Sequence, residues 1–220
     1  MIELHQFTEA GGHAENEDAL QIRTLSGEQE GFLFALADGQ GGQTGAARAA
    51  RIACQAVIEQ ALNLPTRLLL VPTSWIQILE RADQAVSDDP SAGFTTLVAF
   101  CLTSDFICGG SCGDSAAALI AGNREEIILT ERQSKNPPVG SGSAPFTWFA
   151  RKLPEAWTVL AMSDGVWKFA SMQAVIKSAA EKHGDEIIQD LLNKCRLPGS
   201  GALQDDFTVT VFHGALTAKG

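Results

Sequence analysis

The sequence has no apolar run long enough to span a lipid bilayer, which takes about 20 residues. Its first residues show no basic segment followed by an apolar one, so we expect no secretion signal. Charged residues make up only 19% of the 220 residues, and acidic side chains outnumber basic ones by 26 to 16. This acidic balance argues against nucleic acid and against anionic membranes as partners.

Cysteine is sparse and forms no metal-binding pattern. The number of cysteines is odd, their spacing is irregular, and no two of them show the Cys-x-x-Cys spacing of a zinc site. The five positions are Cys54, Cys101, Cys108, Cys112 and Cys195. We expect reduced, partly buried thiols and therefore a cytoplasmic protein.

The remaining composition is that of an ordinary folded protein. Hydrophobic residues account for 45% of the chain, and a chain of this length can bury a full core. We expect residues 1–220 to form one domain. Residues 136–145 are rich in Pro, Gly and Ser and predict a surface loop.

Apolar periodicity predicts many short strands and few helices. The expected strands span residues 2–7, 19–25, 32–37, 95–102, 106–109, 116–121, 126–129, 157–162 and 207–212. The expected helices span residues 43–62, 73–86, 171–180 and 185–195. Strand and helix do not alternate regularly, which favours antiparallel sheets with helices packed outside them.

Acidic residues recur where apolar strands end. Asp38 and Asp164 each follow such a strand and precede a glycine, which lets the backbone turn. A turn explains any one of these motifs. Several carboxylates that meet in space repel one another unless a cation neutralises them, and Mg²⁺ and Mn²⁺ prefer oxygen ligands. Two such ions can share a carboxylate and activate a water for displacement at phosphorus.

The ordered motifs resemble those of one family, the metal-dependent protein phosphatases of the PP2C (PPM) type. In chain order they are Asn16-Glu17-Asp18, Asp38-Gly39-Gln40-Gly41-Gly42, Gly93-Phe94-Thr95-Thr96, Gly113-Asp114-Ser115, Ser163-Asp164-Gly165 and Asp205-Asp206-Phe207-Thr208. The resemblance implies an α+β fold, a four-layer α-β-β-α sandwich of two antiparallel sheets flanked by helices. The stretch from Thr130 to Ser163 is short for the family, so we expect the flap subdomain to be shortened or absent.

The resemblance also implies a two-metal centre. Asp38 would bridge two Mn²⁺ or Mg²⁺ ions, the Gly39 carbonyl would bind one of them, and Asp164 and Asp205 would complete the other. Catalysis would depend on Asp38, Asp164 and Asp205 through a metal-bridging hydroxide that attacks phosphoserine or phosphothreonine in one step. A phosphorylated protein would be the substrate, and a cognate Ser/Thr kinase or its targets are further candidate partners.

Other acidic positions are implied to act around this centre. Glu17 and Asp18 would act mainly through metal-bound water. Asp114 matches the position that, together with Asp164, holds a third metal ion in bacterial members.

Several residues depart from the family pattern. His13 stands where an Arg often grips the substrate phosphate, and a neutral His lacks the two-pronged grip of Arg. We keep His13 as a candidate phosphate ligand. Gln40, Ala116, Arg132 and Gln133 also replace usual family residues. These departures leave a second interpretation open, a catalytically weak PP2C-like regulatory module.

Two unrelated enzyme classes fit the sequence poorly. Gly109–Gly113 matches the Gly-x-Ser-x-Gly motif of serine hydrolases, with His183 and His213 downstream, but no long helix is expected to follow it. Gly39–Gly45 follows a strand as in dinucleotide-binding folds, but Thr44 occupies the position of the last glycine.

Overall fold

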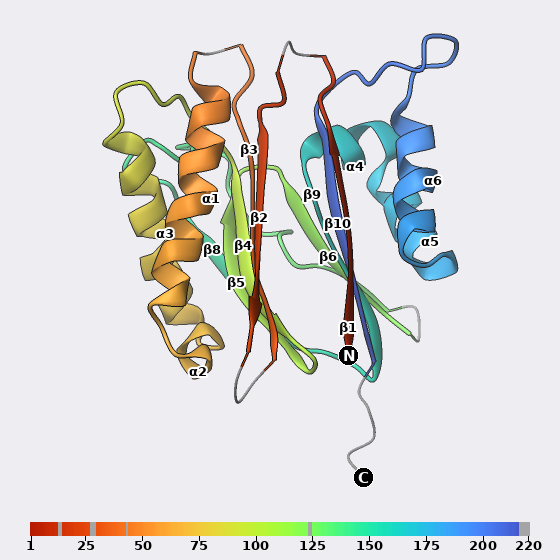
Figure 1. Ribbon diagram of the computed structural model, residues 1–220, viewed down its shortest axis with the longest axis horizontal. Helices are drawn as coiled ribbons and strands as arrows, with labels where there is room; N and C mark the ends of the chain where they lie inside the picture. The colour runs from red at the N-terminus through yellow and green to blue at the C-terminus, as the bar shows by residue number, and fades with distance from the viewer. Residues whose placement is uncertain (13–14, 27–29, 43, 123–124, 216–220) are drawn as a thin grey trace.

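The structure, a computed structural model, describes residues 1–12, 15–26, 30–42, 44–122 and 125–215. Two antiparallel sheets of five strands each pack face to face (Figure 1). The first sheet contains, in spatial order, β1 (Ile2–Glu9), β10 (Phe207–Ala215), β9 (Ala156–Met162), β6 (Ala116–Ala121) and β7 (Glu126–Ile128). The second contains β2 (Asp18–Leu25), β3 (Gly31–Asp38), β4 (Leu97–Thr103), β5 (Phe106–Cys112) and β8 (Thr147–Lys152).

Helices cover the outer face of each sheet, as Figure 1 shows. The second sheet is covered by α1 (Ala46–Leu62), α2 (Thr66–Leu69) and α3 (Pro72–Ser87). The first is covered by α4 (Asp164–Ala170), α5 (Met172–Glu181) and α6 (Asp185–Cys195). No helix in the described ranges is both long and apolar enough to cross a membrane. The four layers confirm the predicted α-β-β-α sandwich.

The apolar core forms three layers, one under each set of helices and one between the sheets. Phe34 and Phe100 of the second sheet stack with ring centres 4.5 Å apart. Phe212 of the first sheet lies 5.8 Å from the Phe34 ring and 5.9 Å from the Phe100 ring. Strands β3 and β4 are buried on both faces, which explains their continuous apolar sequences.

Some predicted boundaries were wrong. Helix α1 begins at Ala46, not at residue 43, because Gly45 adopts a left-handed conformation with φ of 84°. Residue 43 itself lies outside the described residues. Helix α3 begins at Pro72, one residue before the predicted start at residue 73, because the fixed φ of proline suits a first helical position. The predicted hairpin of β6 and β7 is confirmed by their antiparallel pairing, although Asn123 of its turn is not described.

Three elements were not predicted, namely α2, α4 and β8. Helix α2 has 4 residues and α4 has 7, too few for a helical period to show. Strand β8 is an edge strand with an exposed Trp148, so it lacks a clear apolar alternation. The short segment between β7 and β8 agrees with the predicted reduction of the flap.

A buried carboxylate fastens the segment between β7 and β8 to helix α3. Asp83 of α3 is only 3% exposed, and its two oxygens accept hydrogen bonds from the backbone N–H groups of Gly140 (2.6 Å) and Ala144 (3.0 Å). Val139 also exchanges two backbone hydrogen bonds with Thr95. Without Asp83, two backbone donors of this segment would lose their partner.

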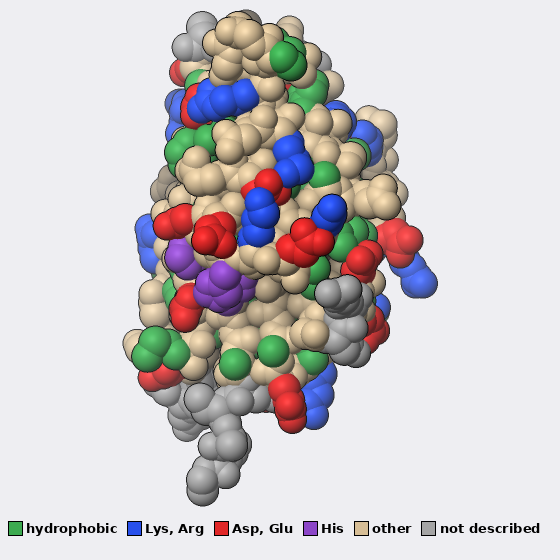
Figure 2. Space-filling model, turned by 90° about the vertical axis from the view of Figure 1, so that its right-hand side faces the viewer, with side chains coloured by type: hydrophobic (Ala, Val, Ile, Leu, Met, Phe, Trp, Pro, Cys, Tyr) green, Lys and Arg blue, Asp and Glu red, His purple; other side chains and the backbone are tan. Residues whose placement is uncertain are grey.

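A histidine cluster joins the turn between α5 and α6 to the first sheet (Figure 2). The buried His213 of β10 hydrogen-bonds through Nδ1 to the Thr158 hydroxyl (2.9 Å), and its Nε2 accepts the Gly184 N–H (2.9 Å). The His183 ring stacks on it at 3.8 Å. Burial, with contributions from His183 and His5, lowers the pKa of His213 to about 4. The ring is therefore neutral in the folded protein at neutral pH.

We expect Asp83→Ala to lower the free energy of unfolding by about 3 kcal/mol, because it leaves two partly buried N–H groups without the charged acceptor that now satisfies them. Asp88→Ala, at the exposed end of the same helix, serves as the control and should cost less than about 0.5 kcal/mol. Urea unfolding of the two variants measures both values. Equal losses in the two variants would contradict the assigned role of Asp83.

We expect His213 to make the protein less stable in mild acid. Its pKa is lower in the folded state than the ordinary 6.5, so the unfolded chain binds the proton more tightly. The stability that the neutral ring provides is complete above pH 6.5 and declines as the pH falls from 6.5 towards 4. Between pH 7 and pH 5, wild type should lose about 2 kcal/mol more than His213→Gln. Chemical denaturation at the two pH values tests this, and equal losses would refute it.

Candidate metal centre

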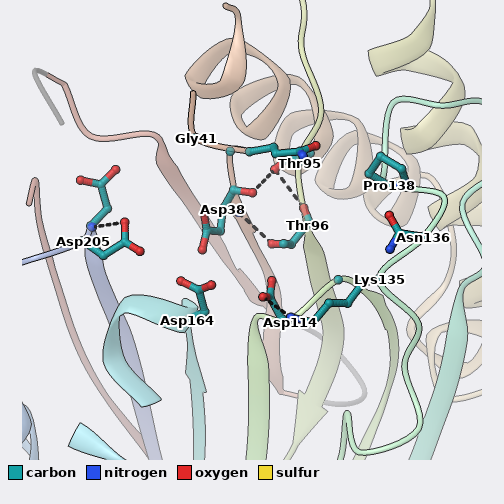
Figure 3. A pocket seen from close by; sticks show the side chains of 14 residues that line it. Asp38, Gly41, Thr95, Thr96, Asp114, Lys135, Asn136, Pro138, Asp164 and Asp205 are labelled. Carbon is teal, nitrogen blue, oxygen red and sulfur yellow. Dashed lines mark hydrogen bonds and ion pairs between the residues drawn. The ribbon is translucent and has the colours of Figure 1, made fainter. Parts of the chain in front are cut away.

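Four predicted acidic residues converge at one end of the sandwich. Asp38 is the last residue of β3, Asp164 the first of α4, and Asp114 and Asp205 lie two residues after β5 and before β10. All four line a cleft with a volume of about 480 Å³. Figure 3 shows the carboxylates of Asp38, Asp114 and Asp164 pointing towards a shared space. Four segments distant in sequence thus supply one acidic site.

The backbone of Asp38 is fixed by the threonines that follow Gly93-Phe94. Its carbonyl accepts hydrogen bonds from the Thr96 N–H and the Thr95 hydroxyl, both at 2.8 Å. Its N–H donates to the Thr96 hydroxyl (3.0 Å). On the other side, Asp38 pairs in register with Asp18 of β2. The two threonines, which lie just before β4, therefore hold the Asp38 backbone in place.

The glycines after Asp38 and Asp164 are required by close backbone approach. A Cβ at Gly39 would lie 2.6 Å from the carbonyl group of Ala46, and one at Gly165 would lie 2.0 Å from the Asp206 carbonyl oxygen. Neither backbone neighbour can move aside cheaply. The Asp-Gly pairs thus let α1 and β10 pack directly against the acidic strand ends.

Asp206 was not among the predicted site residues, although it belongs to the Asp205-Asp206 motif. It is 4% exposed and accepts the backbone N–H groups of Gly11 (2.8 Å) and Glu17 (2.6 Å). Its own N–H donates to the Asp205 carboxylate (3.0 Å). Asp206 also lines the cleft, and it fixes the segment that leads into β2. The two consecutive acidic residues, Asp205 and Asp206, were the sequence signal from which this role of Asp206 could have been predicted.

Two carboxyl groups of the acidic cluster have raised pKa values, so they ionise less readily than usual. Burial raises the pKa of Asp38 to about 9, and the charges of Asp18, Asp164, Asp205 and Asp114 add to that effect. Burial also raises the pKa of Asp18 to about 7. Neither Asp18 carboxylate oxygen has a hydrogen-bond partner at normal distance, although the Thr208 and Ser163 hydroxyls lie near enough to favour its charged form somewhat. These groups need a cation to ionise fully at neutral pH.

Two lysines neutralise the opposite side of the cluster. Burial opposes ionisation of Asp114, but Lys135 and Lys168 outweigh it and lower the pKa of that carboxyl. Burial raises the pKa of Asp164, and its ion pair with Lys168 offsets only part of the rise. Sequence reasoning missed both lysines. The i,i+4 spacing of Asp164 and Lys168 on a helix was the signal for one of them.

The donor set fits a hard divalent cation. The groups that could hold ions are all oxygen donors, namely the carboxylates of Asp38, Asp164 and Asp205 and the carbonyl of Gly39, and the buried Asp18 oxygens lack partners. As the side chains stand, no group of three or more His, Cys, Asp or Glu residues in the described ranges is arranged to hold a metal ion.

The remaining predicted residues lie around the cleft or outside the description. Glu17 and Asp18 do not line the cleft. Asp18 is the neighbour of Asp38 on the adjacent strand β2, and it borders a groove between β1 and β2. Gln40 lines the cleft. His13, the candidate phosphate ligand, lies outside the described residues.

The structure does not fit either rival enzyme class. Ser111 lies within β5 and is fully buried, whereas a hydrolase nucleophile stands exposed on a sharp turn. Both sheets are antiparallel, whereas dinucleotide-binding folds require a parallel sheet.

Comparison with solved structures finds the same fold in a serine/threonine phosphatase and in further proteins. The catalytic domain of the serine/threonine phosphatase PstP, solved with two manganese ions, is 19% identical with a TM-score of 0.74, covering 97% of this chain and 98% of that one. RsbX, solved with magnesium, is 14% identical with a TM-score of 0.72 over 96% of this chain and 94% of its own. PppA of Pseudomonas aeruginosa is 16% identical with a TM-score of 0.68 over 98% of both chains.

A search of curated protein sequences finds no match. The family comparison, in contrast, matches protein phosphatase 2C over residues 10–191, which includes the Asp38, Asp114 and Asp164 motifs. Because this match spans most of the 220 residues, the chain belongs to the protein phosphatase 2C family.

Proposed function

We propose that this protein hydrolyses phosphoserine and phosphothreonine in proteins and depends on Mn²⁺ or Mg²⁺. The observation that carries the proposal is the convergence of Asp38, Asp114, Asp164 and Asp205 on one cleft, together with the raised pKa of Asp38. The family and the metals present in PstP and RsbX support it.

Each residue has a distinct part in this proposal. Asp38, the Gly39 carbonyl, Asp164 and Asp205 would hold two ions, with Glu17 and Asp18 acting around them through water. Bound ions of this kind supply a Lewis acid for the phosphoryl oxygens and activate a water for in-line attack without a phosphoenzyme. The hydrogen bonds of Thr95 and Thr96 to the Asp38 backbone fix the position from which its carboxylate projects.

The open cleft suits a phosphorylated side chain presented by another protein. No flap formed by the described residues covers it, and the segment fastened by Asp83 supplies Lys135, Asn136 and Pro138 to its wall. A phosphoprotein, with a cognate kinase or its targets as further partners, is therefore the proposed substrate. A cytoplasmic location is proposed as well, because all five cysteines are buried and unpaired.

A regulatory module that binds phosphoprotein without cleaving it is the second candidate. It is favoured by His13 standing where the family often has Arg and by side-chain positions that do not yet form a three-ligand metal site in the described ranges. A measurement of turnover separates the two candidates.

We expect wild type to release phosphate from a phosphothreonyl peptide with Mn²⁺ and not with EDTA. Asp38→Asn should lower that rate at least about 100-fold, because it removes the carboxylate proposed to bridge both ions. Saturating Mn²⁺ should also raise the melting temperature of wild type by about 5 °C and leave Asp38→Asn unchanged. A malachite-green assay and a thermal-shift scan provide the two readouts.

The matched control is Asp185→Asn, an acid that is exposed on α6 and does not line the cleft. It should retain wild-type activity and Mn²⁺ stabilisation. In EDTA, Asp38→Asn should be at least as stable as wild type, because the substitution removes a carboxyl whose raised pKa makes it take up a proton on folding at neutral pH. Mn²⁺ stabilisation of wild type without any phosphate release would reject the enzyme and favour the regulatory module.

A further inference from the structure

The ammonium group of Lys168 lies between two carboxylates of the cleft. It pairs with Asp164 Oδ2 and lies 3.2 Å from Asp114 Oδ2. Lys135 contacts the same Asp114 oxygen at 2.6 Å. The carboxylates of Asp114 and Asp164 are 18% and 12% exposed, so water screens these pairs only in part. Asp114 and Asp164 are therefore already paired with lysine side chains of the protein itself.

The position of Lys168 is set by the packing of α4. Val166 is fully buried in the layer between α4–α6 and the first sheet, and Asp164 lies one turn before Lys168. Trp167 donates a hydrogen bond from its indole N–H to the Asp114 carbonyl (2.9 Å). The residue before Lys168 therefore fixes the loop that carries Asp114 against the helix that carries Asp164. Both acids and the lysine are held in one arrangement.

A divalent ion between Asp114 and Asp164 would need the oxygens that Lys168 already engages. Mg²⁺ binds oxygen at about 2.0–2.1 Å and demands near-ideal geometry, so it cannot share that space with an ammonium group. The two cations would also repel each other at close range in a partly buried site. The lysine supplies one charge that is covalently fixed and does not exchange with solvent.

We infer that Lys168 is a positioning residue whose ammonium group takes the place of a divalent cation between Asp114 and Asp164. Ions are thereby confined to the side of the cleft lined by Asp38 and Asp205, to which Asp164 offers the carboxylate oxygen that Lys168 does not engage. This inference deepens the proposed function and rests on it for the ions at Asp38. It replaces the expectation of a third ion at Asp114. Lys135 contributes less, because it touches Asp114 alone and its side chain is 58% exposed.

The test is the number of Mn²⁺ ions bound per chain, measured by equilibrium dialysis and elemental analysis. Lys168→Met should bind one ion more than wild type, because it leaves Asp114 and Asp164 without their shared cation. Lys168→Arg keeps a cation there and should match wild type. Lys177→Met, an exposed lysine on α5, is the control and should also match it. Adding Asp114→Asn to Lys168→Met should remove the extra ion.

Each outcome bears on the inference and separates it from the proposed function. Equal Mn²⁺ numbers in wild type and Lys168→Met, with ions bound in both, would overturn the inference and leave the metal-dependent enzyme standing. One ion in Lys168→Met and none in wild type would support the inference and reject ions at Asp38. No binding in any variant would reject both. Lys168→Gln, checked by circular dichroism, replaces Lys168→Met if the latter fails to fold.

Discussion

Mutual repulsion of carboxylates at one end of the sandwich is the constraint to which the surrounding structure responds. Asp38 lies at the end of a strand that is buried on both faces, so it cannot move away from Asp18, Asp164 and Asp205 without disrupting the second sheet. Burial and, to a smaller extent, this repulsion raise the pKa of Asp38 and Asp18. The three apolar layers must provide the stability that this cluster removes.

Backbone hydrogen bonds, more than salt bridges, hold the acidic strand ends together. Asp206 ties the segment before β2 to the start of β10, and Thr95 and Thr96 tie the start of β4 to Asp38. Asp83 does the same for the segment that forms the far wall of the cleft. Each of these contacts joins segments from different elements. The geometry of the cleft therefore depends on the whole sandwich, which is why the site cannot survive as an isolated motif.

The sequence predicted features that depend on local pattern and failed for those that depend on tertiary contacts. Apolar runs ending in Asp38 and Asp164 predicted strands and acidic strand ends, because burial on both faces leaves a continuous apolar signature. The role of Asp83 could not be predicted, because its partners Gly140 and Ala144 come from a distant segment. Lys168 was missed because α4 has only 7 residues, too few to reveal a helical face.

Asp114 and Asp38 provide different evidence about function. Asp114 is paired with Lys135 and Lys168, so its retention is explained by structure alone and gives little evidence for catalysis. Asp38 has no such partner: of the described residues lining the cleft, Lys135 is the only cation, and it pairs with Asp114. A partly buried carboxylate with four neighbouring acidic groups destabilises the fold unless a ligand neutralises it. Among the converging acids, Asp38 therefore gives stronger evidence for a metal-dependent activity than Asp114 does.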